Sequence, residues 1–197
     1  MDEIRYILAS ASPRRRELLA KLLTYFEVVP SNASENIAPG TDPVDAAMEN
    51  AMNKALAVSE RYPDAIVIGA DTLVVLDGSI IGKPADPEEA VTMLEALSGK
   101  THQVITGIAM VHGALDVKLS NFDFSDVTFR TLDRNDIEAY VNERNPLDMA
   151  GGYGIQEVMD TFIEGLDGDF NNVMGLPLDL TAEMLDAMNV VIYRLQE

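Results

Sequence analysis

Apolar residues are gathered in short runs along the chain, and polar or turn-forming residues bound each run. The most apolar stretch, Ala65 to Leu76, is interrupted only at Gly69 and Asp71-Thr72. A run of this kind is typical of a central strand that is buried on both faces. Further strands are predicted at residues 6–9, 26–30, 79–81, 104–111 and 119–129, the last with Phe122, Phe124, Val127 and Phe129 as core candidates.

Helix-start signals lie between these strands. Asp42-Pro43, Asp86-Pro87 and Asp133 each supply an N-cap residue, and in two cases a proline follows at the first helical position. They predict helices from residue 43 to near Tyr62, from 87 to Ser98-Gly99, and from 133 to near Glu143. A last helix is expected after residues 171–178. No repeat or linker separates these elements, so we expect residues 1–197 to form a single domain.

The stretch from Ser10 to Leu19 combines a strand end, a polar turn and a helix start. Ser12 fits the N-cap position and Pro13 the first helical position. Arg14–Arg16 then fall in the first turn, where the positive end of the helix dipole disfavours cations. A bound anion, held by the helix end and by the guanidinium groups, would resolve this conflict. The alternative is a solvated arginine face on a helix with a buried stripe of Leu18, Leu19, Leu22 and Leu23.

Asp71 is the one carboxylate inside the most apolar run. A buried carboxylate is costly unless it is paired or bound to a metal, which favours a functional role. The alternative is a structural aspartate that caps a turn beside Gly69. Asp77-Gly78 predicts a hairpin, and antiparallel pairing through it would bring Lys83 back toward Asp71. Lys54, on the helix predicted from residue 43, is most simply interpreted as a surface lysine.

The charge of the chain limits its partners. The formal net charge is -19, which argues against nucleic acid polymers and anionic membranes. Five of the 14 lysines and arginines nevertheless lie in the first 21 residues, a distribution that suits a small anionic ligand. The absence of cysteine excludes thiolate catalysis and disulfides, and two histidines disfavour a histidine zinc site. Because neither a signal peptide nor a membrane-spanning run of ~20 residues is recognisable, we expect a cytoplasmic location.

An ordered set of motifs, distributed over nearly the full length, is more specific than any of its members. The motifs are Ser10-Ala11-Ser12-Pro13-Arg14-Arg15-x-Glu17-Leu18-Leu19, Glu35, Lys54-Ala55, Ile68-Gly69-Ala70-Asp71-Thr72, Gly82-Lys83-Pro84, Leu97-Ser98-Gly99, Thr101-His102-x-Val104-x-Thr106-Gly107, Ala150-Gly151-x-Tyr153-Gly154-Ile155-Gln156 and Val173-Met174-Gly175-Leu176-Pro177. With this set the chain resembles the Maf family of nucleoside triphosphate pyrophosphatases.

The resemblance implies a mixed α/β fold, with an elongated central sheet flanked by helices and a cleft between two lobes, similar to inosine triphosphatases. It implies hydrolysis of a nucleoside triphosphate to the monophosphate and pyrophosphate with Mg²⁺ or Mn²⁺, often by a homodimer. The branch that acts on dTTP and UTP resembles this chain at Arg14, Thr72 and Gln156. Glu157 departs from that branch, which usually has glycine there.

The residues and the resemblance together give each candidate a role. The catalytic candidates are Asp71, Lys83 and Lys54, and the family's proton acceptor falls on Asp71. The substrate-binding candidates are Ser10, Arg14, Arg15, Thr72 and Gln156. The metal-ligating candidates are Glu35 and Asp71. Two other hypotheses stay open: a nucleotide-binding regulator of septum formation without essential turnover, and an acidic α/β protein with no nucleotide site.

Overall fold

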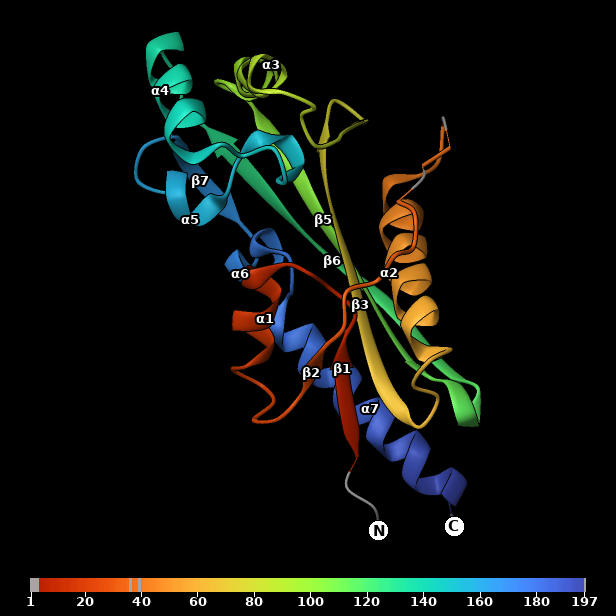
Figure 1. The fold of residues 1–197 in the computed structure, drawn as a ribbon. Helices are drawn as coiled ribbons and strands as arrows, with labels where there is room; N and C mark the ends of the chain where they lie inside the picture. Colours follow the sequence, from red (N-terminus) through yellow and green to blue (C-terminus); the bar gives the residue numbers. More distant parts are fainter. Residues whose placement is uncertain (1–3, 36, 39, 197) are drawn as a thin grey trace. The chain divides into compact units, whose positions relative to one another are not determined.

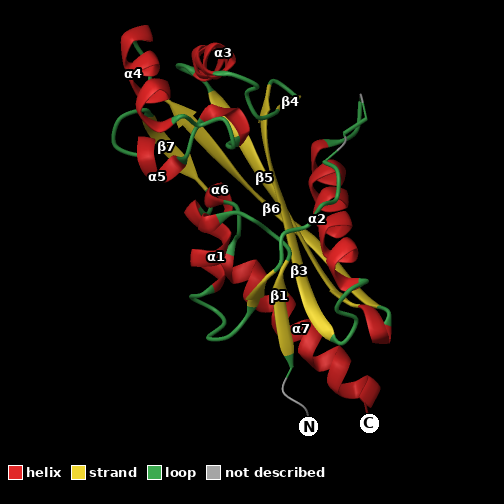
Figure 2. Ribbon diagram, viewed as in Figure 1, coloured by secondary structure: helices red, strands yellow, loops and turns green. Residues whose placement is uncertain are grey.

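The computed structural model describes residues 4–35, 37–38 and 40–196, which form a seven-stranded sheet with seven α-helices (Figures 1 and 2). The strand order is β2-β1-β3-β5-β6-β7, and β4 pairs with β3. Strand β1 is parallel to β2 and β3, whereas β4 and β7 are antiparallel to their partners β3 and β6. The expected mixed sheet with flanking helices is therefore confirmed.

The elements alternate along the chain. The strands are β1 (Arg5–Leu8), β2 (Glu27–Val28), β3 (Ala65–Leu76), β4 (Ser79–Ile81), β5 (Thr101–His112), β6 (Val117–Phe129) and β7 (Ile163–Asp167). The helices are α1 (Pro13–Leu19), α2 (Pro43–Ser59), α3 (Pro87–Leu97), α4 (Arg134–Arg144), α5 (Ile155–Val158), α6 (Phe170–Met174) and α7 (Leu178–Gln196). Two 3₁₀ turns, η1 (Gly113–Leu115) and η2 (Ala150–Gly152), complete the chain. No helix in the described part is long and apolar enough to cross a membrane.

The chain divides into two compact units, which are described separately below. The first comprises residues 1–71, 106–123 and 175–197, and the second comprises residues 72–105 and 124–174. Strands β3, β5 and β6 each contribute residues to both units. That residues 1–197 form a single domain stays a prediction.

In the first unit, α2 lies directly against the backbone of the sheet. Its buried residues Ala47, Ala51, Ala55 and Val58 are those predicted to point inward. A Cβ atom on Gly69 of β3 would overlap the carbonyl oxygen of Ala51, and one on Gly107 of β5 would lie 2.5 Å from that of Ala47. Only glycine permits such an approach. At these two glycines the backbone of the helix therefore lies directly against the backbone of the strands.

Helix α7 packs on the opposite face of β1. The Tyr6 hydroxyl donates a hydrogen bond to Oδ1 of Asn189 on α7, at 3.0 Å. The next residue, Ile7, belongs instead to the apolar cluster under α2. Because successive side chains of a strand point to opposite faces, α2 and α7 cover the two faces of the sheet in this unit.

Two local predictions are wrong, and one strand was missed. Helix α1 ends at Leu19, so Leu22 and Leu23 lie outside it and are only partly buried. Phe124 is 51% exposed, because it alternates with the buried residues Ser125, Val127 and Phe129 and so faces the other side of β6. Strand β7 was not predicted, since its sequence Ile-Glu-Gly-Leu-Asp offers too few apolar positions.

An aromatic cluster forms the core of the second unit. His102, Phe129 and Tyr153 stack edge to face with centroids 5.0–5.5 Å apart, and Phe162 and Tyr140 extend the cluster. Nε2 of His102 lies 2.7 Å from the Tyr153 hydroxyl. Burial lowers the pKa of His102 from 6.5 to about 4, so the imidazole is neutral at pH 7.

The depressed pKa of His102 predicts a loss of stability in mild acid. An unfolded histidine binds a proton near pH 6.5, whereas the folded one binds it near pH 4. The free energy of unfolding should therefore be greatest above pH 6.5 and fall toward pH 4 by as much as about 3 kcal/mol. Urea unfolding of the wild type and of His102→Asn between pH 7.5 and 4 measures this. An identical pH dependence in the two proteins would contradict the assignment to His102.

Candidate active site

The arginine turn has the predicted local structure. Ser12 is the N-cap of α1, and its hydroxyl accepts a hydrogen bond from the Arg15 N–H at 3.4 Å. Pro13 occupies the first helical position. The hydroxyl of the buried Ser10 accepts a hydrogen bond from the Ser12 N–H at 3.2 Å and so closes the turn. Along the helix Arg14 is half-buried, whereas Arg16 is exposed.

Arg15 turns toward the interior of the first unit. Its Nε donates to the carbonyl oxygen of Gly175 at 2.8 Å, which ties α1 to the segment before α7. Burial lowers the pKa of the Arg15 guanidinium, while the nearby carboxylates of Asp71 and Glu35 act in the opposite direction and Arg14 adds to the lowering. Arg15 thus has a structural contact as well as two acidic neighbours, a combination that the sequence did not indicate.

Lys54 is at the centre of a charged cluster on the face of α2 that meets β3. Its ammonium lies 2.6 Å from Oδ1 of Asp71 and 2.7 Å from Oε1 of Glu35, and it donates more weakly to the Ala70 carbonyl at 3.5 Å. Lys54 is 8% exposed and Asp71 is 5% exposed. Both simple interpretations are therefore wrong: Lys54 is not a surface lysine, and Asp71 caps no turn.

Asn50 is a member of this cluster that the sequence analysis missed. Its Nδ2 donates to Oδ2 of Asp71 at 2.9 Å, and the side chain is buried. Asn50 precedes Lys54 by four residues, so both lie on the same face of α2. A polar residue on the alanine-rich face, one turn before Lys54, was the signal that could have revealed it.

The acidic residues of the cluster fit a magnesium-type cation. Among the described residues there is no group of three or more His, Cys, Asp or Glu side chains that could hold a metal ion. Glu35 and Asp71 do approach the same ammonium, and the Glu35 side chain is 41% exposed. Mg²⁺ is commonly held by one or two carboxylates while waters and substrate phosphates supply its other ligands. The two carboxylates thus match this cation better than a metal that needs a protein cage.

The other predicted residues belong to the second unit. The hairpin is confirmed: Leu76 pairs with Ser79, and Asp77 and Gly78 have φ angles of 50° and 78°. Lys83 follows β4 and is exposed, and Thr72 is half-buried in β3. That Lys83 approaches Asp71 stays a prediction.

The glycine-rich loop folds into η2 and α5, and α5 carries Gln156 on its exposed side. The Tyr140 hydroxyl anchors this segment, because it accepts from the Gly154 N–H at 3.1 Å and donates to Oε2 of Glu157 at 2.9 Å. Glu157, the departure from the dTTP/UTP branch, therefore has a structural partner within its own unit.

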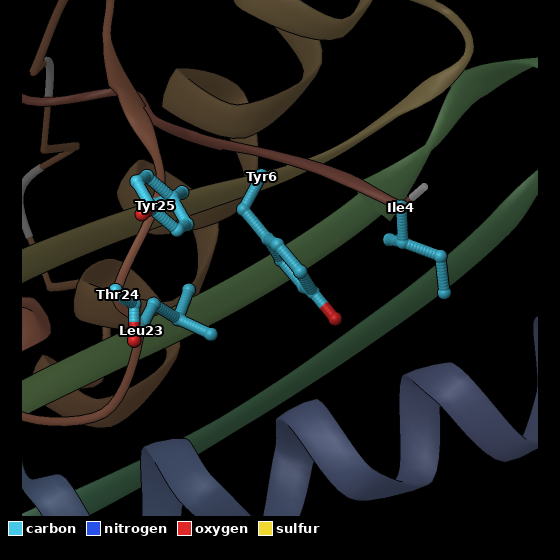
Figure 3. A pocket seen from close by; sticks show the side chains of 5 residues that line it. All are labelled: Ile4, Tyr6, Leu23, Thr24 and Tyr25. Atoms are coloured by element: carbon cyan, nitrogen blue, oxygen red, sulfur yellow. The ribbon is translucent and has the colours of Figure 1, made fainter. Parts of the chain in front are cut away.

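A separate pocket of about 370 Å³ lies in the first unit between β1 and the segment after α1 (Figure 3). Its lining residues are Ile4, Tyr6, Leu23, Thr24 and Tyr25. None of the predicted site residues lines it, and its walls carry no charged group. It is therefore no candidate for binding a triphosphate.

Three comparisons place the chain among known proteins. It is 46% identical over 187 residues to a dTTP/UTP pyrophosphatase of Symbiobacterium thermophilum, with 95% of each chain covered. It is 42% identical to a dTTP/UTP pyrophosphatase of Bacillus cereus, with 94% of this chain and 96% of that one covered. A solved HAM1 protein from Coxiella burnetii is similar over 64% of this chain and 73% of that one, at 17% identity and a TM-score of 0.44.

The family comparison covers most of both units. The model of the Maf-like protein family matches residues 5–188, a range that includes every candidate residue from Ser10 to Gln156. The sequence resemblance is thus confirmed independently of the fold. The chain belongs to the Maf-like protein family.

Proposed function

We propose that this protein hydrolyses dTTP and UTP to the nucleoside monophosphate and pyrophosphate. The relatives that carry this name are 42–46% identical over nearly the whole chain. The structural observation that carries the proposal is the buried Asp71, whose carboxylate is held by Lys54 and Asn50. A carboxylate fixed in this way, beside a second carboxylate and near Arg15, suits metal-assisted attack on a polyanion.

In the proposed reaction a water attacks the α-phosphorus. Asp71 accepts a proton from this water as the new P–O bond forms, and the bond from the α-phosphorus to the bridging oxygen breaks to release pyrophosphate. Ser10, Arg14, Arg15 and Lys83 hold the phosphates through charge-assisted hydrogen bonds. Glu35 and Asp71 would hold Mg²⁺ or Mn²⁺, which would supply neutralisation of the phosphate charge. Lys54 keeps the two carboxylates together, since its donors are directed at protein oxygens.

The proposed base selectivity depends on the second unit. A side-chain amide offers one donor and one acceptor, which match the N3–H and carbonyl edge of uracil and thymine. Gln156 is exposed on α5 and is our candidate for this amide, and the half-buried Thr72 is a second candidate for binding the base. Cytosine lacks the N3–H, and purines need a wider pocket, so CTP should be weaker and GTP poor.

The test is a panel of triphosphates with purified protein and Mg²⁺, read as phosphate release after added inorganic pyrophosphatase. We expect kcat/KM for dTTP and UTP to exceed that for GTP by about 100-fold or more. A preference for GTP or 7-methyl-GTP would overturn the substrate assignment. Binding of dTTP without any product would favour a nucleotide-binding regulator of septum formation instead. Activity that survives removal of divalent cations with EDTA would overturn the proposed metal requirement.

The arginine turn offers a matched pair of variants. Arg14→Ala should lower kcat/KM for dTTP by roughly 10- to 1000-fold, because the substitution removes a half-buried guanidinium that would stabilise the developing phosphate charge. Arg16→Ala should have little effect, since Arg16 is exposed two residues further along the helix. Steady-state kinetics of both variants measure the difference. Equal losses would show that the roles within the turn are wrongly assigned.

Two further proposals concern the setting of the reaction. We propose that the protein acts in the cytoplasm, since its proposed substrates are polyanions that do not cross membranes unaided. We also propose a homodimer, which exposed apolar side chains of the first unit support, among them Ile4, Tyr25, Val190 and Tyr193. Light scattering after size-exclusion chromatography tests the dimer, and the mass of a single 21.5 kDa chain would contradict it.

A further inference from the structure

The two oxygens of the Asp71 carboxylate have different partners. Oδ1 faces the ammonium of Lys54 at 2.6 Å, and Oδ2 accepts from the amide of Asn50 at 2.9 Å. An ionised carboxylate only accepts hydrogen bonds, so it must be the amide nitrogen of Asn50 that faces it. Oδ1 thus contacts a charged donor, and Oδ2 contacts a neutral one.

The two donors differ in the length of their side chains and in the number of acceptors they contact. The ammonium of Lys54 ends a long stem, and it also serves Glu35 and the Ala70 carbonyl. The Asn50 amide is on a short side chain, 3% exposed, that starts from the part of α2 held against Gly69. Without the Asn50 donor, both oxygens of Asp71 could turn toward Lys54, because a carboxylate prefers the charged donor. The bond from Asn50 therefore keeps Oδ2 of Asp71 apart from the ammonium that Oδ1 contacts.

We propose that Asn50 is a positioning residue, which fixes the plane of the Asp71 carboxylate so that Oδ2 is held away from Lys54 and presented to the reacting water. This inference rests on the proposed triphosphate hydrolysis at the same site. It assigns a role to a neutral amide that contacts the base and that the sequence motifs did not include.

The test uses Asn50→Leu, which keeps the branching of the side chain at Cγ but is larger and has no donor, and Asn53→Leu as its control. Asn53 is exposed on the same helix, only three residues away. We expect Asn50→Leu to lower kcat for dTTP by about 10- to 100-fold, the effect of a misplaced catalytic group, with KM nearly unchanged. Asn53→Leu should match the wild type in both constants.

A second variant separates positioning from packing. Asn50→Asp conserves the shape of the side chain but replaces the amide nitrogen that donates to Oδ2 of Asp71 with a carboxyl oxygen. kcat should then fall with KM nearly unchanged, a split that a role in packing alone would not cause. A wild-type kcat in both Asn50 variants would overturn the proposal.

The arrangement can also be tested without activity. In crystal structures of Asn50→Leu we expect the Asp71 carboxylate to rotate, with both oxygens approaching the ammonium of Lys54. An unchanged carboxylate in that variant would overturn the positioning role. If the wild type hydrolysed no triphosphate, the proposed function would fail, whereas this structural comparison would still decide what holds Asp71.

Discussion

Replacing Asp71 with asparagine should reduce kcat for dTTP by about 10²- to 10⁴-fold, the range for losing a general base. The substitution conserves shape but removes the basic oxygen and a negative charge beside Lys54 and Glu35. The fold should persist, because an asparagine can still accept from Lys54 through its carbonyl oxygen. Stopped assays at saturating dTTP, together with thermal unfolding, measure the two effects separately.

The control for this variant lies on the same hairpin. Asp77→Asn removes an exposed carboxylate at the turn after β3, where φ is 50° and asparagine is well tolerated. It should retain the activity of the wild type. If Asp71→Asn also retained it, Asp71 could not be the base, and Glu35 would be the remaining carboxylate of the cluster.

Replacing Lys54 with methionine should impair both stability and turnover. The substitution leaves Asp71 and Glu35 without their shared cation, and breaking a buried pair in this way typically costs about 3 to 5 kcal/mol. Because Glu35 is 41% exposed, water should relieve part of this cost, so we expect about 2 to 3 kcal/mol. Urea unfolding gives the loss of stability, and initial rates with dTTP give the loss of turnover.

A double variant tests whether repulsion is the cause. Adding Asp71→Asn to Lys54→Met removes one of the two carboxylate charges that Lys54 separates. The double variant should therefore lose less stability than the sum of the losses in the two single variants. Lys118→Met, at an exposed lysine paired with Asp116, should change stability by less than about 0.5 kcal/mol. Strict additivity in the double variant would show that Lys54 stabilises the fold by packing alone.

The sequence predicted local elements better than contacts. Strand β3 and the helix starts at Pro43 and Pro87 were correctly placed, because apolar runs and Asp-Pro pairs are local signals. The C-terminal end of α1 was placed too late in the sequence. Leu22 and Leu23 continue the helical spacing of leucines, although the helix ends at Leu19. Propensity and periodicity do not record where a helix stops when no glycine or proline marks the end.

The candidate site shows the same limit. Asp71 was recognised because a carboxylate in an apolar run conflicts with its surroundings, and Arg14 because it conflicts with the helix dipole. Asn50 and the burial of Lys54 were not recognised, although a polar residue on the alanine-rich face of α2 is a weak local signal. Their contacts with Asp71 depend on how closely α2 approaches β3, which is a tertiary property.

The glycines under α2 make the site sensitive to the smallest possible change of sequence. At Gly69 and Gly107 the backbone of α2 contacts a residue without a side chain. A single methyl group at either position would overlap the helix backbone and push the helix away from the sheet. Asn50 and Lys54 would move with the helix, whereas Asp71 would stay with the strand. Saturation mutagenesis should accordingly find these two positions as intolerant as the charged residues themselves, although neither has a side chain with which to react.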